Sequence, residues 1–443
     1  MSEHDSQATL AGWGNLPVPG REVLSEDLPA ATRGAVLSRG LGRSYGDSSL
    51  PPPSRREVVG TRLADRILAW DPASGVLRAE AGLSLWEINR LLLRRGWFVS
   101  STPGTQFVSL GGMVAADVHG KGHHRFGSFG AHVRSLRMRV ADGSIVECGP
   151  GSEPELFWAT VGGMGLTGHI LEVELQLQAI PSPWIYGESR RVADIDEFVA
   201  ALKEVSRDWP FCVGWIDCLS RGEHMGRGIL DYGRWATREE APRPLPFTRR
   251  LTLPFEFPSR TINRLTTRAF NFLWYWKHVQ KVRRGLKHPD AFFYPLDGVL
   301  HWNRIYGRRG FTQYQCVLPG SAGQGAARRF LELLTRMGGA SFLCVIKDCG
   351  PEGQGLLSFL RDGISIAVDV PVRDDTQALV DALNELVIAE GGRIYLAKDA
   401  FTRPEHYAAM DPRLPAFNAV RDRWDPRRAI RSAQSVRVLG DPP

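Results

Sequence analysis

Hydrophobic and polar positions repeat with a helical period in the N-terminal part of the chain. Residues 84–95 show this most clearly. Their apolar positions on one face are Leu85, Ile88, Leu91 and Leu92. Ser84 is placed to cap the helix, and Glu87, three residues later, completes a capping box. We predict further short helices over residues 110–117 and 155–161.

Alternation of apolar and polar residues predicts strands around these helices. The expected strands cover residues 34–38, 60–69, 76–81 and 168–177. Residues 133–140 and 144–148 should form a hairpin, because Asp142-Gly143 is a strong signal for a type I′ turn. Residues 1–30 are rich in Pro, Ser and acidic residues, and we expect a tail with turns there.

The pattern changes near residues 180–183, Ile-Pro-Ser-Pro, where a domain boundary is expected. Beyond it, strands and amphipathic helices alternate. The predicted strands are 211–217, 312–318, 341–347 and 365–370, and the predicted helices are 192–206, 326–337 and 376–390. This order favours an α+β domain with a mainly antiparallel sheet.

Length and composition agree with a folded protein of two domains. The chain has 443 residues, of which 43% are hydrophobic. Its formal charge is +7, which suggests an anionic partner such as a phosphate, a nucleic acid or a membrane surface. An ordinary basic enzyme would have the same charge.

The six cysteines contain no CxxC pair and no zinc spacing. We expect reduced, partly buried thiols, with a disulfide between Cys344 and Cys349 as the alternative.

The first 16 residues lack the apolar core of a signal peptide, and no apolar run is long enough to span a bilayer. The protein is therefore expected to be soluble or peripheral to a membrane.

A glycine-rich loop is the first segment that carries chemistry. It consists of Arg39, Gly40, Leu41, Gly42, Arg43, Ser44, Tyr45, Gly46 and Asp47. Glycines let the backbone approach a ligand closely, and successive N–H groups in such a loop bind an anion. Arg39 and Arg43 add positive charge, so we expect a pyrophosphate here. The spacing is not the Rossmann fingerprint, and an ordinary glycine turn is the alternative.

A second polar region includes Pro103-Gly104-Thr105, Ser109 to Gly112 and Asp117 to His124. Glycines at the start of a helix favour phosphate binding there. His119, His123 and His124 also suggest a metal site. Because Asp117 is the only nearby carboxylate of suitable spacing, we predict no metal; a surface loop with incidental histidines is a further alternative. Residues 158–168 form another glycine-dense turn, which tight packing alone would explain.

Aromatic and basic residues interleave between residues 255 and 287. Among them are Phe270, Phe272, Trp274 and Trp276, with Arg268, Lys277 and Lys287. Aromatic rings suit a bilayer interface, and Lys and Arg meet anionic headgroups. The stretch is either a membrane-facing lid or a core helix with a basic outer face. No signature of a nucleic-acid-binding fold is present, so no nucleic acid is expected.

Taken in order, these segments resemble the FAD domain of the vanillyl-alcohol-oxidase type: RGLGRSYGD, PGT, GG, DVHGKGHH, GSFGAHVRS and ELFWATVGG with GLTG. Over nearly the whole chain the sequence is more closely similar to the decaprenylphosphoryl-β-D-ribose 2-oxidase family. Later matching segments are FYPLD at 293–297, WNR at 302–304, QYQ at 313–315, SFL at 341–343, VD at 368–369 and GRIYLAKD at 392–399. The resemblance implies an α+β fold of two domains. These are a PCMH-type FAD-binding domain at 1–181, with a C-terminal return at 392–443, and an antiparallel-sheet substrate domain at 182–391.

The resemblance also implies the cofactor site. Around FAD it places the glycine-rich loop together with Gly104, Ser109, Leu110, Gly111, Gly112, Ala116, Asp117, Val118, His119, Ile170 and Tyr395. The superfamily often links FAD covalently to a histidine in the region of His119. Since the closer family keeps FAD non-covalent despite this histidine, we predict non-covalent FAD.

Lys398 matches the active-site lysine of the family, beside the flavin. A cation there would stabilise anionic reduced flavin, and a desolvated lysine could take a hydroxyl proton; an exposed lysine at a strand end is the alternative. The implied substrate pocket consists of Tyr45, His119, Lys121, Trp215, Arg304, Gln313, Gln315, Lys347 and Ser365. Of these, Gln313, Gln315 and Lys347 could bond sugar hydroxyls or phosphate. Gln313 and Gln315 share one face of a strand, which allows a joint role in the pocket, although a solvent-facing side would look the same.

The chain departs from the family at three pocket positions. Ala367 stands where the family has an inhibitor-reactive cysteine, Ser365 replaces a neighbouring asparagine, and Phe293 replaces a tyrosine. We expect Ala367 to spare activity and to block covalent attack by nitroaromatic inhibitors. The segment before Gly34 is shorter than in the family and should lack a helix.

The resemblance implies FAD-dependent oxidation of the 2-hydroxyl of a polyprenylphosphoryl ribose to a 2-keto sugar, the first half of epimerisation to an arabinose donor for cell-wall arabinan. The implied partners are a short-chain-type keto-reductase and quinone or oxygen as electron acceptor. The expected location is peripheral to the bacterial inner membrane, with the cytoplasmic face favoured and the periplasmic face as the alternative. The other hypotheses are an oxidase of free alditols or aldonolactones, and a non-catalytic flavin- or lipid-binding protein.

Overall fold

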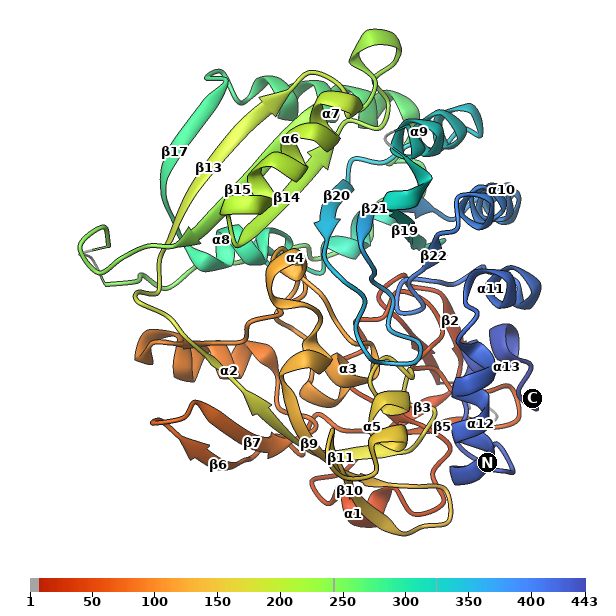
Figure 1. Cartoon of the computed structure of the whole chain (residues 1–443). Coiled ribbons are helices and arrows are strands. Elements are labelled where there is room, and N and C mark those ends of the chain that lie inside the picture. Colours follow the sequence, from red (N-terminus) through yellow and green to blue (C-terminus); the bar gives the residue numbers. More distant parts are fainter. Residues whose placement is uncertain (1–7, 242–243, 324) are drawn as a thin grey trace.

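The computed structural model describes residues 8–241, 244–323 and 325–443. Two layered halves lie one above the other, with a long sheet in the upper half and smaller sheets with short helices in the lower half (Figure 1). The chain begins in the lower half, builds the upper half and returns to the lower half at its C-terminal end.

The lower half contains two sheets. The five-stranded antiparallel sheet has the order β10-β9-β11-β7-β6, and the three-stranded parallel sheet has the order β3-β5-β4. The bounds of the strands are β3 Arg21–Leu24, β4 Ser38–Arg39, β5 Glu57–Gly60, β6 Ile67–Asp71, β7 Val76–Glu80, β9 Val133–Arg139, β10 Ile145–Cys148 and β11 His169–Gln176. The helices are α1 Leu28–Ala31, α2 Leu85–Leu92, α3 Leu110–Ala115, α4 His123–Phe126 and α5 Pro154–Thr160. Two small pairs, β1 Thr9–Ala11 with β2 Pro17–Pro19 and β8 Trp97–Phe98 with β12 Gln178–Ala179, complete this half.

The upper half is built on one eight-stranded antiparallel sheet of order β17-β13-β15-β14-β20-β21-β19-β22. Its strands are β13 Ile185–Val192, β14 Phe211–Ile216, β15 Gly228–Trp235, β17 Val282–Lys287, β19 Phe311–Pro319, β20 Cys344–Cys349, β21 Gly363–Pro371 and β22 Arg393–Ile394. Helices α6 Ile195–Asp208, α9 Ala326–Arg336 and α10 Thr376–Ala389 pack on one face of this sheet (Figure 1). The remaining elements here are α7 Arg264–Trp276, α8 Pro289–Phe293 and the parallel pair β16 Leu251–Thr252 with β18 Val299–Leu300.

The predicted α+β class with an antiparallel second sheet is confirmed. Helix α2 begins as its sequence indicates: the Ser84 side chain accepts from the Glu87 backbone N–H, and Glu87 accepts from the Ser84 backbone N–H. Its apolar face, with Leu85 and Ile88, is buried.

The six cysteines are free and buried, so the alternative of a disulfide between Cys344 and Cys349 is wrong.

Four local predictions were wrong in the lower half. The expected strand over 34–38 is absent except for Ser38, which begins β4. Residues 1–7 lie outside the described residues, but residues 8–31 form β1 to β3 and α1 rather than a tail. Residues 61–66 separate β5 from β6, so the expected strand over 60–69 does not exist as one element. In the hairpin of β9 and β10, Gly143 has a positive φ of 91° and Asp142 does not. The turn is therefore not type I′, because that type needs positive φ at both central residues.

Strands β13, β15 and β17 were not predicted, and the expected helix over 192–206 begins only at Ile195. These strands carry charged residues that pair across the sheet instead of the usual apolar residues. Glu188 on β13 binds Arg284 on β17 and the Tyr232 hydroxyl on β15, and Lys287 pairs with Asp231. Cross-strand ion pairs stabilise a sheet but hide its apolar alternation from a sequence pattern.

Helix α7 buries polar residues and exposes apolar ones, which is the reverse of an ordinary surface helix. Its buried residues are Thr267, Asn271 and Tyr275, and Asn271 donates to Asp217 and to the carbonyl of Ser341. Its exposed residues include Leu265, Phe272, Leu273 and Trp276, whose exposed fractions run from 48% to 78%. The alternative of a core helix with a basic outer face is therefore wrong, because the apolar side faces outward.

The C-terminal segment joins the two halves. Strand β22 pairs with β19, and the chain then forms α11 Pro404–Met410, α12 Leu414–Trp424 and α13 Ala433–Leu439 beside the lower half (Figure 1). On α13, Arg437 binds Asp47 at 2.7 Å and Asp399 at 2.9 Å. This ion-pair network holds the end of the glycine-rich loop next to Lys398. The division into domains at 181/182 and 391/392 stays a prediction.

Candidate active site

A cavity of about 760 Å³ lies between the lower half and the face of the large sheet opposite helices α6, α9 and α10. Its size falls within the range of cofactor and substrate pockets. From the lower half it is lined by the glycine-rich loop, by Gly104, Ser109, Gly111 and Gly112, and by Met164 to Gly165. From the sheet it is lined by alternate residues of five strands: Gln313 and Gln315, Ala367, Val345 and Lys347, Val213 and Trp215, and Ile229 and Asp231.

The glycine-rich loop presents its backbone to the cavity. None of the N–H groups of residues 40–44 donates a hydrogen bond to a described residue. Gly42 has a φ of 62°, and a Cβ there would lie 2.4 Å from the Arg39 guanidinium. Consecutive N–H groups without partners around a left-handed residue have the geometry of an anion site, and the predicted pyrophosphate contact stays a prediction.

The loop residues divide into two groups. Gly40 to Tyr45 line the cavity, whereas Arg39, Gly46 and Asp47 do not. Arg39 donates to Ser49 and to the carbonyl of Ala11, so it supports the loop from behind. A Cβ at Gly46 would lie 1.8 Å from the carbonyl oxygen of Asp399, which explains the glycine by close packing.

The start of helix α3 differs from the expectation of a phosphate site. The N–H groups of Leu110 and Gly111 donate to the carbonyls of Leu83 and Ala81. The Ser109 hydroxyl accepts from the Gly112 N–H. Because these N–H groups have partners in the protein, α3 supplies the cavity wall and not an anion site; Leu110 itself faces the core.

Asp117 is also structural. It is buried away from the cavity, and its carboxylate accepts from the hydroxyls of Ser128 and Ser358 and from the Gly130 N–H. Burial raises the pKa of this carboxyl group. Asp117 therefore fixes the chain before His119, while Ala116, Val118, His119, Ile170 and Tyr395 line the cavity as expected.

Two observations support a large planar anionic cofactor such as FAD at this end of the cavity. Gly104 and Gly165 line it, and a Cβ on either would meet nothing within 4 Å, so both glycines leave space for a ligand. The Nδ1 atom of His119 is buried without a hydrogen-bond partner in the described protein. A buried polar atom of this kind needs a partner, which a ligand in the cavity would provide.

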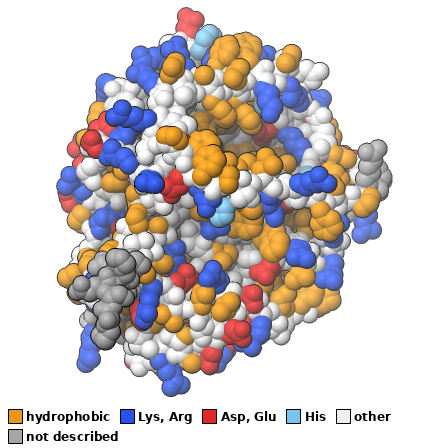
Figure 2. Space-filling model, turned by 180° about the vertical axis from the view of Figure 1, so that it is seen from behind, with side chains coloured by type: hydrophobic (Ala, Val, Ile, Leu, Met, Phe, Trp, Pro, Cys, Tyr) orange, Lys and Arg blue, Asp and Glu red, His pale blue; other side chains and the backbone are white. Residues whose placement is uncertain are grey.

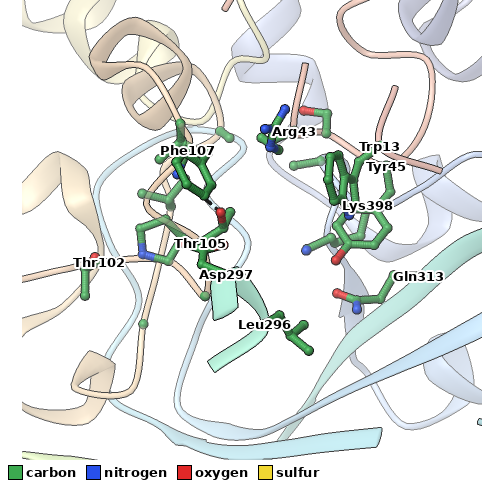
Figure 3. A pocket seen from close by; sticks show the side chains of 18 of the residues that line it. Trp13, Arg43, Tyr45, Thr102, Thr105, Phe107, Leu296, Asp297, Gln313 and Lys398 are labelled. Atoms are coloured by element: carbon green, nitrogen blue, oxygen red, sulfur yellow. Dashed lines mark hydrogen bonds between the residues drawn. The ribbon is translucent and has the colours of Figure 1, made fainter. Parts of the chain in front are cut away.

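Lys398 lines the cavity beside the glycine-rich loop. Its ammonium stands over the Tyr45 ring, with Nζ 3.7 Å from the ring centroid, and Gln313 lies nearby (Figure 3). Burial lowers the pKa of Lys398, Asp369 raises it and Lys347 lowers it. The alternative of an exposed lysine at a strand end is wrong, because the side chain enters the cavity.

Hydrogen bonds between strands β19 and β21, and from these strands to His119 and Tyr306, hold the amides near Lys398. Gln313 donates to Asp369, which also accepts from the Tyr306 hydroxyl at 2.7 Å. Gln315 donates to the Ser365 hydroxyl at 3.1 Å and meets His119 Nε2 at 2.9 Å. Ser365 therefore helps to hold the Gln315 amide in place, and it does not itself line the cavity. Burial, followed by Lys347, lowers the pKa of His119 well below its usual value, so its ring is neutral.

The other histidines and Arg304 have structural partners. His123 Nδ1 accepts from the Gly350 N–H, and His124 contacts the carbonyl of Trp209. Across residues 8–241, 244–323 and 325–443, no group of three or more His, Cys, Asp or Glu residues could hold a metal ion. Arg304 donates to the carbonyl of Leu253 and lies outside the cavity, so its expected role in the substrate pocket has no support in this geometry.

Sequence reasoning missed several cavity residues. Trp13 stacks with Arg43, whose guanidinium lies 4.4 Å from its ring centroid, and Phe107 and Asp297 face them across the cavity (Figure 3). Asp231 and Lys287 also line the cavity. The alternation of Ile229 and Asp231 on one strand was the available signal, but β15 was not predicted.

Comparisons with known proteins agree with this geometry. The sequence profile that describes an FAD binding domain matches residues 28–149. A decaprenylphosphoryl-beta-D-ribose oxidase of Mycolicibacterium smegmatis is 34% identical, over 97% of each chain. An L-gulono-1,4-lactone dehydrogenase of Mycobacterium tuberculosis is 23% identical over 96% of this chain and 95% of its own. A Delta(24)-sterol reductase of Rattus norvegicus is 26% identical over 25% of this chain and 22% of its own.

Proposed function

Because the chain belongs to the decaprenylphosphoryl-beta-D-ribose oxidase family of FAD-dependent oxidoreductases, we propose that it oxidises the 2-hydroxyl of a polyprenylphosphoryl ribose to a ketone. The observation that carries this proposal is the position of Lys398 over the Tyr45 ring and near Gln313, in the part of the cavity where the glycine-rich loop presents N–H groups that have no partner among the described residues. FAD, when bound, supplies the hydride-accepting chemistry of such an oxidation.

The residues of this chain supply orientation and proton transfer. The amides of Gln313 and Gln315 are held in place by Asp369, His119 and Ser365, so they are pre-organised to bond sugar hydroxyls. The Lys398 amine is the proton acceptor in this proposal, because burial lowers its pKa towards neutrality. We also propose that FAD is held without a covalent link, as the closer family resemblance implies.

The substrate is tested by anaerobic bleaching of the flavin. We expect polyprenylphosphoryl ribose to bleach the purified enzyme, and free xylitol or gulonolactone to leave it yellow at the same concentration. Bleaching by the free sugars alone would remove the lipid-linked substrate and favour an alditol or lactone oxidase. Acid precipitation of the same protein should release the FAD into the supernatant.

We further propose that the exposed face of α7 contacts an anionic membrane. The described helices include none that is long and apolar enough to cross a bilayer. The inverted arrangement of α7 leaves Leu273 and Trp276 outward, beside Lys277 and Arg191, whose guanidinium lies 4.9 Å from the centroid of the Trp276 ring, and this combination suits a bilayer interface. Figure 2 shows one face of the molecule on which hydrophobic side chains gather around a hollow, with Lys and Arg beside them.

Replacing Leu273 and Trp276 together by serine should lower binding to vesicles that contain phosphatidylglycerol roughly 10- to 100-fold, because two large apolar side chains no longer leave water. Sedimentation with the vesicles measures the bound fraction. The matched control replaces Leu63 and Leu68, whose exposed fractions are 44% and 45%, and should bind like the wild type. Equal binding by both double variants would remove α7 as the membrane contact.

In this proposal the bacterial inner membrane holds the lipid-linked substrate, and the cytoplasmic face is favoured. A short-chain-type keto-reductase would complete the epimerisation, and quinone or oxygen would accept the electrons. The location of Phe270 and Trp274 supports the link to the membrane, because these α7 residues also line the cavity.

A further inference from the structure

Four lysines line the cavity, but their charges are compensated unequally. Lys287 pairs with Asp231 at 3.0 Å and donates to the Ser189 hydroxyl. For Lys121, Lys347 and Lys398, no carboxylate of the described residues makes an ion pair. Burying an unpaired ammonium is unfavourable unless an anion enters with it. Three lysines of the cavity therefore lack an anionic partner from the described part of the protein.

The four lysines lie one after another along the cavity, beside different strands of the large sheet. Lys398 lies beside Gln313 on β19, at one end. Lys347 is on β20, two strands further, and it lowers the pKa of both Lys398 and Lys121. Lys121 approaches from the lower half, donates to the carbonyl of Phe292 and lies 4.8 Å from the centroid of its ring. Lys287 lies against the same ring at 5.9 Å.

Beyond Lys121 and Lys347 the cavity becomes aromatic. Trp215 on β14 is fixed by a 2.9 Å hydrogen bond to the carbonyl of Phe342, and its ring meets Trp274 of α7 edge to face. Phe270 stacks on Trp274 and meets Phe342. All four aromatic residues line the cavity. The order from the cofactor end outward is thus amides, unpaired lysines and aromatic rings.

We propose that Lys121 and Lys347 form a subsite for the phosphate of a polyprenyl-phosphate sugar, between the sugar at Gln313 and Gln315 and the first isoprene units along Trp215 and Trp274. This inference rests on the proposed function. A phosphodiester anion complements the two unpaired ammoniums, and the order of polar, anionic and apolar groups in such a lipid matches the order of groups along the cavity. Lys287 and Asp231 position the rim of the subsite as an already neutral pair.

The test compares Lys121→Met and Lys347→Met with the wild type in anaerobic bleaching by polyprenylphosphoryl ribose and by methyl β-D-riboside. Loss of one charge-assisted hydrogen bond should raise the half-saturating concentration of the phosphate-containing substrate about 10- to 100-fold. The half-saturating concentration of the neutral riboside should rise much less, because this sugar has no phosphate to lose a bond to either lysine. Equal losses with both sugars, or no loss with either, would overturn the phosphate subsite.

A second measurement does not depend on turnover. Farnesyl phosphate should perturb the flavin absorbance of the wild type, and the same lysine variants should need about 10- to 100-fold more of it. Farnesol should bind the wild type and the variants alike. Lys203→Met is the matched control, because Lys203 pairs with Asp348 outside the cavity. Full retention of flavin by each variant shows that it is folded.

The two measurements separate the subsite from the proposed function. If polyprenylphosphoryl ribose fails to bleach the wild type, the proposed substrate is wrong, and the farnesyl phosphate series still decides whether the lysines bind a lipid phosphate. If the wild type is bleached but the lysine variants bind both phosphates normally, the substrate stands and the subsite is wrong.

Discussion

Lys398→Met should lower the rate of substrate-driven flavin bleaching by about 10²- to 10⁴-fold, the usual contribution of a positioned general base. FAD should stay bound, because the glycine-rich loop and the cavity wall do not depend on this side chain. Methionine keeps the length and apolar stem of lysine over the Tyr45 ring but has no basic nitrogen. Stopped-flow absorbance with polyprenylphosphoryl ribose measures the rate, and undiminished bleaching would remove the catalytic role of Lys398.

The conservative variant Lys398→Arg separates the two roles that a lysine can have here. Arginine keeps the positive charge but does not release its proton at the pH of the experiment. We expect it to be as slow as the methionine variant, because the amine must accept the hydroxyl proton. Recovery of most of the rate in Lys398→Arg would instead assign the lysine to charge stabilisation of the reduced flavin.

The pH dependence follows from the same assignment. Burial lowers the pKa of Lys398 from 10.5 to about 7, so the neutral amine forms as the pH rises through that value. Wild-type bleaching should therefore increase between pH 6 and pH 8, by roughly the fraction of deprotonated lysine, and level off above. Lys398→Met should lack this step. A wild-type rate that falls over the same range would contradict the base role.

Gly104→Leu should abolish retention of FAD during purification. The missing Cβ of Gly104 points into open space of the cavity, with no atom within 4 Å, so a leucine there occupies the volume that the cofactor needs. Overpacking of this kind costs about 1–3 kcal/mol, which weakens binding roughly 10- to 100-fold. The ratio of flavin absorbance to protein absorbance measures the retained cofactor.

Gly151→Leu is the control for this change. Gly151 is exposed like Gly104, with open space around it and no positive φ, but it does not line the cavity. It should keep its FAD and the melting temperature of the wild type. Full flavin content in Gly104→Leu, with the control behaving as expected, would show that the cofactor does not pass Gly104.

Much of the cofactor end was readable from the sequence. The glycine-rich loop, the capping of α2 and the alternation of β11 are local properties, set by a few neighbouring residues. The same holds for the period-two spacing that puts Gln313 and Gln315 on one face. Local patterns of this kind survive folding because backbone geometry alone decides them.

Other features depended on contacts between distant segments. Three strands of the large sheet stayed hidden because Glu188, Asp231 and Lys287 are paired across strands rather than buried as apolar residues. The N–H groups of α3 looked ready for phosphate, yet Leu83 and Ala81 carbonyls use them. The sequence could not show these partners, because they lie on elements that only the fold brings together.

The sequence by itself determined the FAD-binding domain, the α+β class and the family, since motifs in fixed order over nearly the whole chain carry them. Only the tertiary structure decided which polar residues reach the cavity. It placed Lys398 over Tyr45, left Lys121 and Lys347 without carboxylate partners among the described residues, and removed Arg304 and Asp117 from the cavity lining. The physical reason is that burial and pairing of a charge depend on neighbours far away in the chain, whereas a turn or a cap depends on adjacent residues.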